Sequence, residues 1–196
     1  MSYLKSYGLL VALPLLAGHS QAASFDCSKA AAGSIEALVC KTPALSAQDE
    51  QLAKVYKQAT AKAKGQQAKT LKAEQRGWLK GRDECWKAED KTRCVSDNYQ
   101  QRIAELQVNY ALVPGKGPFK FRCDNQPAKQ LTATFYPTEP ATLLAAFAGS
   151  TSLMYAQPAA SGSKYQGRNE SFWEHQGVAK VVWGYGATEM ACKRLP

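Results

Sequence analysis

The sequence predicts an α+β protein of two domains: a small all-α domain held by disulfides, followed by a small antiparallel β-sandwich or barrel. Apolar residues recur at helical spacing up to about residue 110 and alternate with polar residues beyond it. Residues 111–118, which contain two prolines and two glycines, separate the two patterns and read as a linker. Six cysteines, an even number, predict three disulfides.

Residues 1–23 have the layout of a secretory signal peptide. Lys5 supplies a positive start, residues 8–18 are almost entirely apolar, and residues 20–22 place small side chains at the −3 and −1 cleavage positions. The apolar run is too short to span a bilayer as a helix. We expect cleavage after Ala22 or Ala23.

The same segment argues against a lipid anchor. Residues 16–18 resemble the start of a bacterial lipoprotein box, which requires a cysteine at the next position, but the next residue is His19. Without a thiol there is no group to acylate. We therefore expect a periplasmic or secreted protein with no membrane anchor.

The first domain, residues 24–110, is expected to be helical. Apolar side chains follow one helical face over residues 45–64, Ser46 is a suitable N-cap with Asp49 three residues later, and Gly65 marks a stop. Further helices are expected over residues 68–86 and over residues 28–39. Another is expected where apolar residues recur at helical spacing from Val95 to Leu106.

Four cysteines fall near the ends of these expected helices, where two disulfides would stabilise a domain of this size. The sequence has no tight C-x-x-C pair, so disulfides are favoured over a metal cluster and no metal is expected. Four cysteines allow three pairings. We favour Cys27–Cys94 with Cys40–Cys85.

The second domain, residues 119–196, alternates apolar and polar residues with frequent turn residues, which is typical of a small sandwich or barrel. Cys123 lies in the first expected strand and Cys192 in the last. They are the two cysteines of this half, so the sequence predicts a disulfide that joins the ends of the sheet. Strands are clearest over residues 119–123, 131–136, 152–156 and 177–184.

Composition and motifs disfavour several classes of function. After the signal is removed one histidine remains, His175, and no nucleophile-elbow, P-loop or dinucleotide motif is present. We therefore expect a binding protein rather than an enzyme, with no cofactor. The formal charge of +9 would suit nucleic acid, but the lysines are spread along solvated helix faces of an exported chain, so we expect no nucleic-acid partner.

The first domain resembles the LprI-type lysozyme-inhibitor domain. The resemblance rests on the segments VCKTPALSAQDEQLAKVYKQA, QRGWLKGRDECW and RCVSDNYQQRIAEL, which lie between residues 39 and 106. It covers nearly all of residues 24–108 and implies a helical fold.

The second domain resembles the membrane-bound or periplasmic inhibitors of c-type lysozyme. The shared frame is FRCDN, LTATF, SGSKY, FWEHQG, WGYG and ACKRL. The resemblance implies a small antiparallel β-barrel whose first and last strands are joined by a disulfide. It also implies two inhibitory loops, one with S-G-x-x-Y at residues 161–165 and one at residues 172–177.

The resemblance implies a set of lysozyme-binding residues: Ser161, Gly162, Lys164, Tyr165, His175 and Gln176. A lysozyme cleft holds two catalytic carboxylates. A serine hydroxyl can donate to them, a glycine permits a close backbone approach, and a tyrosine can anchor the loop.

The second loop departs from the family pattern, since it has one extra residue and no lysine. His175 or Gln176 takes the place of the family's lysine, depending on the alignment. An imidazole is positive only when protonated, below pH ~6.5. Inhibition is therefore expected to weaken as pH rises through neutrality.

The resemblance implies a bacterial protein that inhibits c-type lysozyme by inserting the SGSKY loop into the active-site cleft. An alternative partner class is the bacterium's own peptidoglycan-cleaving enzymes, the lytic transglycosylases, whose activity the protein would then regulate.

Overall fold

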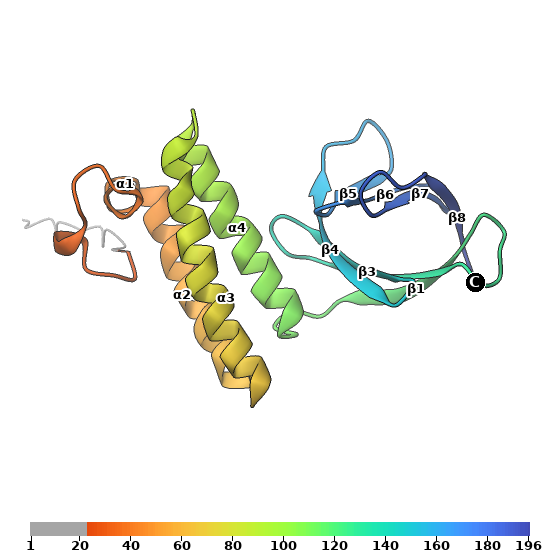
Figure 1. The fold of residues 1–196 in the computed structure, drawn as a ribbon, viewed down its shortest axis with the longest axis horizontal. Helices are drawn as coiled ribbons and strands as arrows, with labels where there is room; N and C mark the ends of the chain where they lie inside the picture. Colours follow the sequence, from red (N-terminus) through yellow and green to blue (C-terminus); the bar gives the residue numbers. More distant parts are fainter. Residues whose placement is uncertain (1–22) are drawn as a thin grey trace, which may run out of the picture.

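The computed structural model describes residues 23–196 and consists of a group of helices beside a β-barrel (Figure 1). The predicted signal peptide lies outside the described residues, except for Ala23. None of the helices in the described part is long and apolar enough to cross a membrane.

The N-terminal part contains four α-helices and two short 3₁₀-helices, numbered in chain order. They are η1 (Cys27–Lys29), α1 (Ile35–Lys41), α2 (Pro43–Lys62), α3 (Gln66–Asp83), η2 (Glu84–Lys87) and α4 (Lys91–Asn109). Side-chain caps fix the starts of two of the α-helices: Ser34 accepts from the N–H of Ala37 at 3.1 Å, and Asp90 accepts from the N–H of Arg93 at 2.9 Å.

The start of α2 differs from the predicted one. The helix begins at Pro43, whose fixed φ and missing N–H suit the first helical position. Ser46 therefore lies inside the helix, where its buried hydroxyl donates to the carbonyl of Val39 at 2.8 Å. Asp49 is also interior and buried, and it belongs to the polar cluster described below.

Apolar faces of α2 and α4 form the centre of the helical core, with one buried leucine from α3. The core is assembled from side chains at the predicted helical spacing. Its largest fully buried members are Val39, Leu45, Leu71, Val95, Tyr99 and Leu106.

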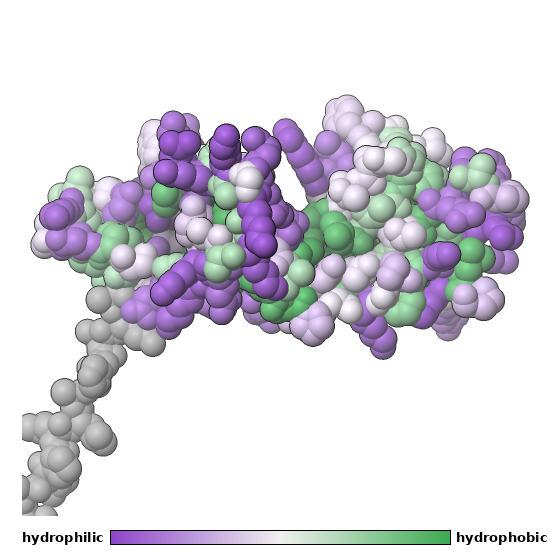
Figure 2. Space-filling view, turned by 90° about the horizontal axis from the view of Figure 1, so that it is seen from below, coloured by the Kyte–Doolittle hydropathy of each residue, from purple (hydrophilic) through white to green (hydrophobic). Residues whose placement is uncertain are grey.

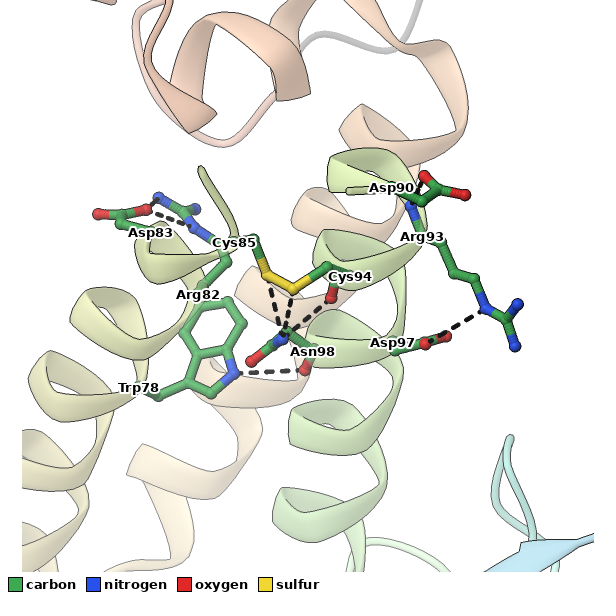
Figure 3. Close-up of a disulfide and its surroundings, with 9 residues drawn as sticks. All are labelled: Trp78, Arg82, Asp83, Cys85, Asp90, Arg93, Cys94, Asp97 and Asn98. Atoms are coloured by element: carbon green, nitrogen blue, oxygen red, sulfur yellow. Dashed lines mark hydrogen bonds and ion pairs between the residues drawn. A yellow bond between two sulfur atoms is a disulfide. The ribbon is translucent and has the colours of Figure 1, made fainter. Parts of the chain in front are cut away.

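The two disulfides of the helical domain join near neighbours: Cys27 bonds Cys40, and Cys85 bonds Cys94. The expected pairing of Cys27 with Cys94 and Cys40 with Cys85 is therefore wrong. The chain turns back sharply between η1 and α1, and again between η2 and α4. These turns bring the paired Cα atoms to 5.9 Å and 5.7 Å, respectively. Figure 3 shows the second bridge, between Cys85 and Cys94. Each bridge thus closes a local corner instead of joining distant helices.

The C-terminal part is a closed barrel of eight antiparallel strands in which each strand pairs with the next and β8 pairs with β1. Closure leaves no free sheet edge. The strands are β1 (Lys116–Cys123), β2 (Gln130–Tyr136), β3 (Thr142–Phe147), β4 (Ser150–Gln157), β5 (Ser163–Gln166), β6 (Glu170–His175), β7 (Val178–Trp183) and β8 (Met190–Arg194). The predicted fold class is confirmed, and β1 begins inside the segment expected to be a linker.

The barrel closes where Cys123 of β1 faces Cys192 of β8, and the predicted disulfide between them is confirmed. Each strand points at least one large or sulfur-bearing side chain into the interior, as expected of a small barrel whose inside is filled by side chains. In strand order these are Phe121, Leu131, Leu143, Met154, Tyr165, Phe172, Val181 and Cys192.

The helices contact the barrel through α4. The Tyr155 hydroxyl of β4 donates to the backbone carbonyl of Gln101 at 3.3 Å. Burial raises the pKa of Tyr155, and the nearby Glu105 raises it further. Figure 2 shows that hydrophilic side chains dominate the helical surface seen from below, as the lysine-rich helices predict.

Candidate functional site

Two loops meet at one end of the barrel. Residues 158–162 connect β4 to β5, and residues 176–177 form the tight turn between β6 and β7. Antiparallel pairing of Ser163 with Glu174 places these loops side by side. The two segments expected to bind lysozyme are thus neighbours, because they flank a single hairpin.

The β6–β7 turn has the geometry of a two-residue hairpin. His175 pairs with Val178, and the two residues between them, Gln176 and Gly177, have φ values of 52° and 81°. Positive φ at both positions matches the twist of the flanking strands. The Glu174 carboxylate accepts from the N–H of Gly177 at 2.7 Å and stabilises the turn.

Trp173 ties the longer loop to the barrel wall. Its indole N–H donates to the carbonyl of Ser161 at 2.9 Å. The next loop residue, Gly162, has a φ of 69°, and a Cβ at this position would overlap the carbonyl oxygen of Glu174. Glycine is therefore required by both its backbone angle and its close approach to β6.

Alanine at Gly162 is expected to cost the barrel about 2–4 kcal/mol of unfolding free energy, because left-handed strain adds to a steric clash. Gly149→Ala is the matched control, since Gly149 has a φ of 78° with open space around its position. Gly149→Ala is expected to cost about 1–2 kcal/mol. Urea unfolding of the two variants measures the difference, and equal losses would show that loop packing contributes nothing.

The structure divides the predicted binding residues into exposed and buried groups. Ser161, Gly162, Lys164, His175 and Gln176 are exposed. Tyr165 points into the barrel, where its ring packs 5.6 Å from that of Phe135, and burial raises the pKa of its hydroxyl. Its position fits a residue that anchors the loop from inside.

A cavity of about 320 Å³ opens beside the two loops and is lined by Ser161, Trp173, His175, Val178 and Lys180. Two of these side chains are large and apolar yet well exposed, Trp173 at 38% and Val178 at 37%. The cavity therefore combines apolar contact area, a hydroxyl group and a lysine. Such a surface suits a protein partner with acidic groups.

Sequence reasoning missed Lys180 as part of this surface. Its strand was expected, and alternation along β7 predicts that Lys180 points outward. Its neighbour across the sheet, Trp173, follows from strand register, which the sequence did not specify.

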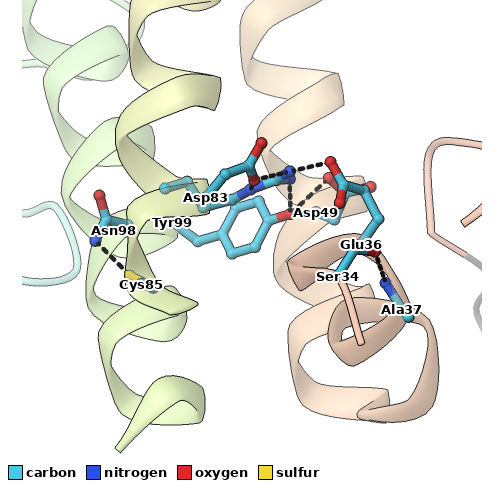
Figure 4. Close-up of polar contacts among 9 residues, drawn as sticks. Ser34, Glu36, Ala37, Asp49, Asp83, Cys85, Asn98 and Tyr99 are labelled. Atoms are coloured by element: carbon cyan, nitrogen blue, oxygen red, sulfur yellow. Dashed lines mark hydrogen bonds and ion pairs between the residues drawn. The ribbon is translucent and has the colours of Figure 1, made fainter. Parts of the chain in front are cut away.

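A second notable site is a polar cluster in the helical domain, centred on Arg82 of α3 (Figure 4). The guanidinium is almost fully buried and donates to the Tyr99 hydroxyl at 2.9 Å, to Glu36 at 3.2 Å and to Asp83 at 2.6 Å. It also lies over the ring of Trp78, at 5.7 Å from the centroid (Figure 3).

The cluster continues from Tyr99 to the start of the described chain. The Tyr99 hydroxyl donates to Asp49 at 2.9 Å, and the other oxygen of Asp49 accepts from the N–H of Ser24 at 2.6 Å. Burial raises the pKa of Tyr99 well above its ordinary value, although the charge of Arg82 opposes this, so the hydroxyl remains a donor at neutral pH. A cavity of about 440 Å³ is lined in part by Ser24, Asp49 and Arg82.

The described residues offer no site suited to a metal: within 23–196, no three histidine, cysteine or acidic side chains are grouped as ligands. Every hydroxyl, amide and charge named in the Arg82 cluster is paired within the protein. This arrangement supports a structural role for the cluster.

Comparison with known proteins finds matches to both domains. A family model described as lysozyme inhibitor LprI matches residues 27–111. A second, described as membrane-bound lysozyme-inhibitor of c-type lysozyme, matches residues 121–190. No solved structure matches the chain.

Similar curated proteins span both domains. Lipoprotein LprI of Mycobacterium bovis and of Mycobacterium tuberculosis are each 31% identical to the chain over 166 residues, which is 84% of this chain and 81% of the relative. The order of the two domains is thus matched by proteins that extend across their junction.

Proposed function

The chain belongs to the LprI family, and on that premise we propose that it inhibits c-type lysozyme by inserting the SGSKY loop, residues 161–165, into the enzyme's active-site cleft. The observation that carries the proposal is the match of both domains, in order, to lysozyme-inhibitor families. The geometry of the barrel end supports the mode of binding.

A loop that plugs a cleft should be rigid before it binds, because ordering a flexible loop reduces affinity. The loop is fastened at three points: the Trp173 indole bonds Ser161, Gly162 packs against the Glu174 carbonyl, and Tyr165 is buried in the barrel. These contacts leave Ser161 exposed next to the cavity. They support a preorganised loop.

The chemistry of the exposed groups fits a cleft with two catalytic carboxylates. In the proposed complex Ser161 donates its hydroxyl hydrogen to one of them. Lys164, His175 and Gln176 lie around the loop and add donors at the rim. The protein thus acts by occupying the cleft, and the proposal assigns it no catalytic step of its own.

We also propose that the protein acts outside the cytoplasm, where lysozyme is encountered. All six cysteines are in disulfides. Disulfides persist in oxidising compartments such as the periplasm and the extracellular space. An exported protein is therefore consistent with the bonding of its cysteines and with the signal predicted from residues 1–23.

The test is a cell-wall lysis assay with a c-type lysozyme and the chain without its predicted signal. We expect inhibition by the unaltered protein. Ser161→Ala should raise the inhibition constant roughly ten- to hundredfold, because it removes a hydrogen bond to a charged group.

Thr151→Ala is the matched control, since it also removes a hydroxyl from an exposed position, at the opposite end of the barrel. It should leave the inhibition constant unchanged. If Ser161→Ala inhibits as well as the control, the loop has a structural role and does not bind the enzyme. The helical domain, which matches the LprI model, would then be the inhibitory part.

A further inference from the structure

The outer wall of the barrel next to the proposed loop carries an aromatic side chain between two lysines. Strand pairing aligns Lys164 of β5 with Trp173 of β6, and Trp173 with Lys180 of β7. All three side chains are exposed, while the neighbouring row of Tyr165 and Phe172 points inward. Two residues of this Lys–Trp–Lys row, Trp173 and Lys180, line the cavity.

Trp173 connects the row to the loop. Its indole N–H holds the Ser161 carbonyl, and its ring lies 6.0 Å from the Lys180 ammonium. Ser161 and Lys180 line the same cavity. A partner's carboxylate that accepts a hydrogen bond from the Ser161 hydroxyl in this cavity is therefore also attracted by the positive charge of Lys180.

Lys180 is available for such a contact. Its ammonium lies 3.5 Å from Glu189, but both side chains are more than half exposed. An ion pair this exposed is weak, because water and salt screen it. The flexible lysine stem can exchange Glu189 for a partner's carboxylate with little loss.

The hairpin turn itself has no permanent cation, since it presents His175 and the neutral Gln176. We infer that Lys180 supplies this charge from the adjacent strand, and that it binds the acidic residues of the c-type lysozyme cleft. Trp173 is the apolar anchor beside it, a residue type that often dominates binding energy at interfaces. This inference rests on the proposed function and names the residues that set its electrostatics.

The experiment compares Lys180→Gln with Lys120→Gln in the full chain without its predicted signal, at low and high salt. Lys120 is an exposed lysine of β1, so the control makes the same charge change away from the cavity. We expect Lys180→Gln to raise the inhibition constant roughly ten- to hundredfold at low salt and Lys120→Gln to leave it near wild type. Lys180→Arg should retain inhibition, because it keeps the charge.

Salt provides a readout that misfolding would not imitate. A contact with Lys180 is screened as ionic strength rises. The wild-type constant should therefore increase with salt more steeply than that of Lys180→Gln. Equal inhibition by the two glutamine variants at low salt overturns this inference while the proposed function stands. If the unaltered chain does not inhibit lysozyme, the proposed function fails, and this inference fails with it.

Discussion

Replacing Arg82 by alanine is expected to lower the unfolding free energy of the helical domain by about 3–5 kcal/mol. The buried guanidinium holds the Tyr99 hydroxyl, Glu36 and Asp83 in one cluster. Its removal leaves these groups without their shared donor and opens a void beside Trp78. A buried polar group that loses its partner bears its full desolvation cost.

Lysine should not restore the stability. The three N–H donors of a lysine are all on one nitrogen atom. Arg82 instead donates from separate nitrogen atoms to separate acceptors and stacks on an aromatic ring. We expect Arg82→Lys to recover less than half of the loss. Urea unfolding followed by far-ultraviolet circular dichroism measures the helical transition.

Arg76→Ala is the control on the same helix, because Arg76 is exposed. It should change the unfolding free energy by less than about 0.5 kcal/mol. A loss at Arg82 no larger than this would mean that the cluster contributes nothing net to folding. The same result would make its cavity a stronger candidate for a ligand site.

The division into a helical part and a strand part could be predicted because the two periods are distinct in the sequence. Helix boundaries were less predictable. Ser46 has the chemistry of a cap, but Pro43 starts the helix earlier and places Ser46 in the core, where it bonds Val39. A local signal was overridden by packing, which sequence alone does not display.

Disulfide pairing shows the same difference between local and spatial information. Cys123 and Cys192 could be paired because the second domain offers no other partners. In the helical domain three pairings were possible, and the choice depends on how tightly the chain turns after Cys27 and after Cys85. Those turns are set by helix packing.

The sequence predicted the candidate site as two loops, whereas the structure shows that strand residues next to these loops line the same cavity. The exposed Ser161 and His175 lie together because β5 and β6 pair in one register. A shift of one residue would reverse which side chains face outward. Lys180 and Trp173 could not be joined to the site until that register was known.

Removing the barrel disulfide, with Cys123→Ala and Cys192→Ala together, is expected to lower the barrel's unfolding free energy by about 4 kcal/mol. The bond joins residues separated by 69 positions, so it restricts the unfolded chain more than the helical bridges, which span 13 and 9 positions. Removing either helical bridge, which closes a shorter loop, is expected to lower the unfolding free energy by about 3 kcal/mol.

The barrel also depends on this bond for closure. Cys123 and Cys192 are a pair in the β1–β8 seam, a short seam with three matched residue pairs. Once the bond is lost, the seam is held by backbone hydrogen bonds and by side-chain contacts such as that of Arg194 with the ring of Phe119. Both strands bear unpaired edges whenever the seam opens. Hydrogen exchange should therefore increase first in β1 and β8.

The matched comparison is Cys85→Ala with Cys94→Ala, which removes a disulfide from the helical domain. Thermal unfolding resolved by circular dichroism should show the helical transition shifted by that variant and the barrel transition shifted by the first. If the barrel variant unfolds with unchanged stability and exchange, the seam is held by strand pairing and interior packing around Phe121 and Phe172. The disulfide would then contribute nothing measurable to the barrel's stability or to the closure of the seam.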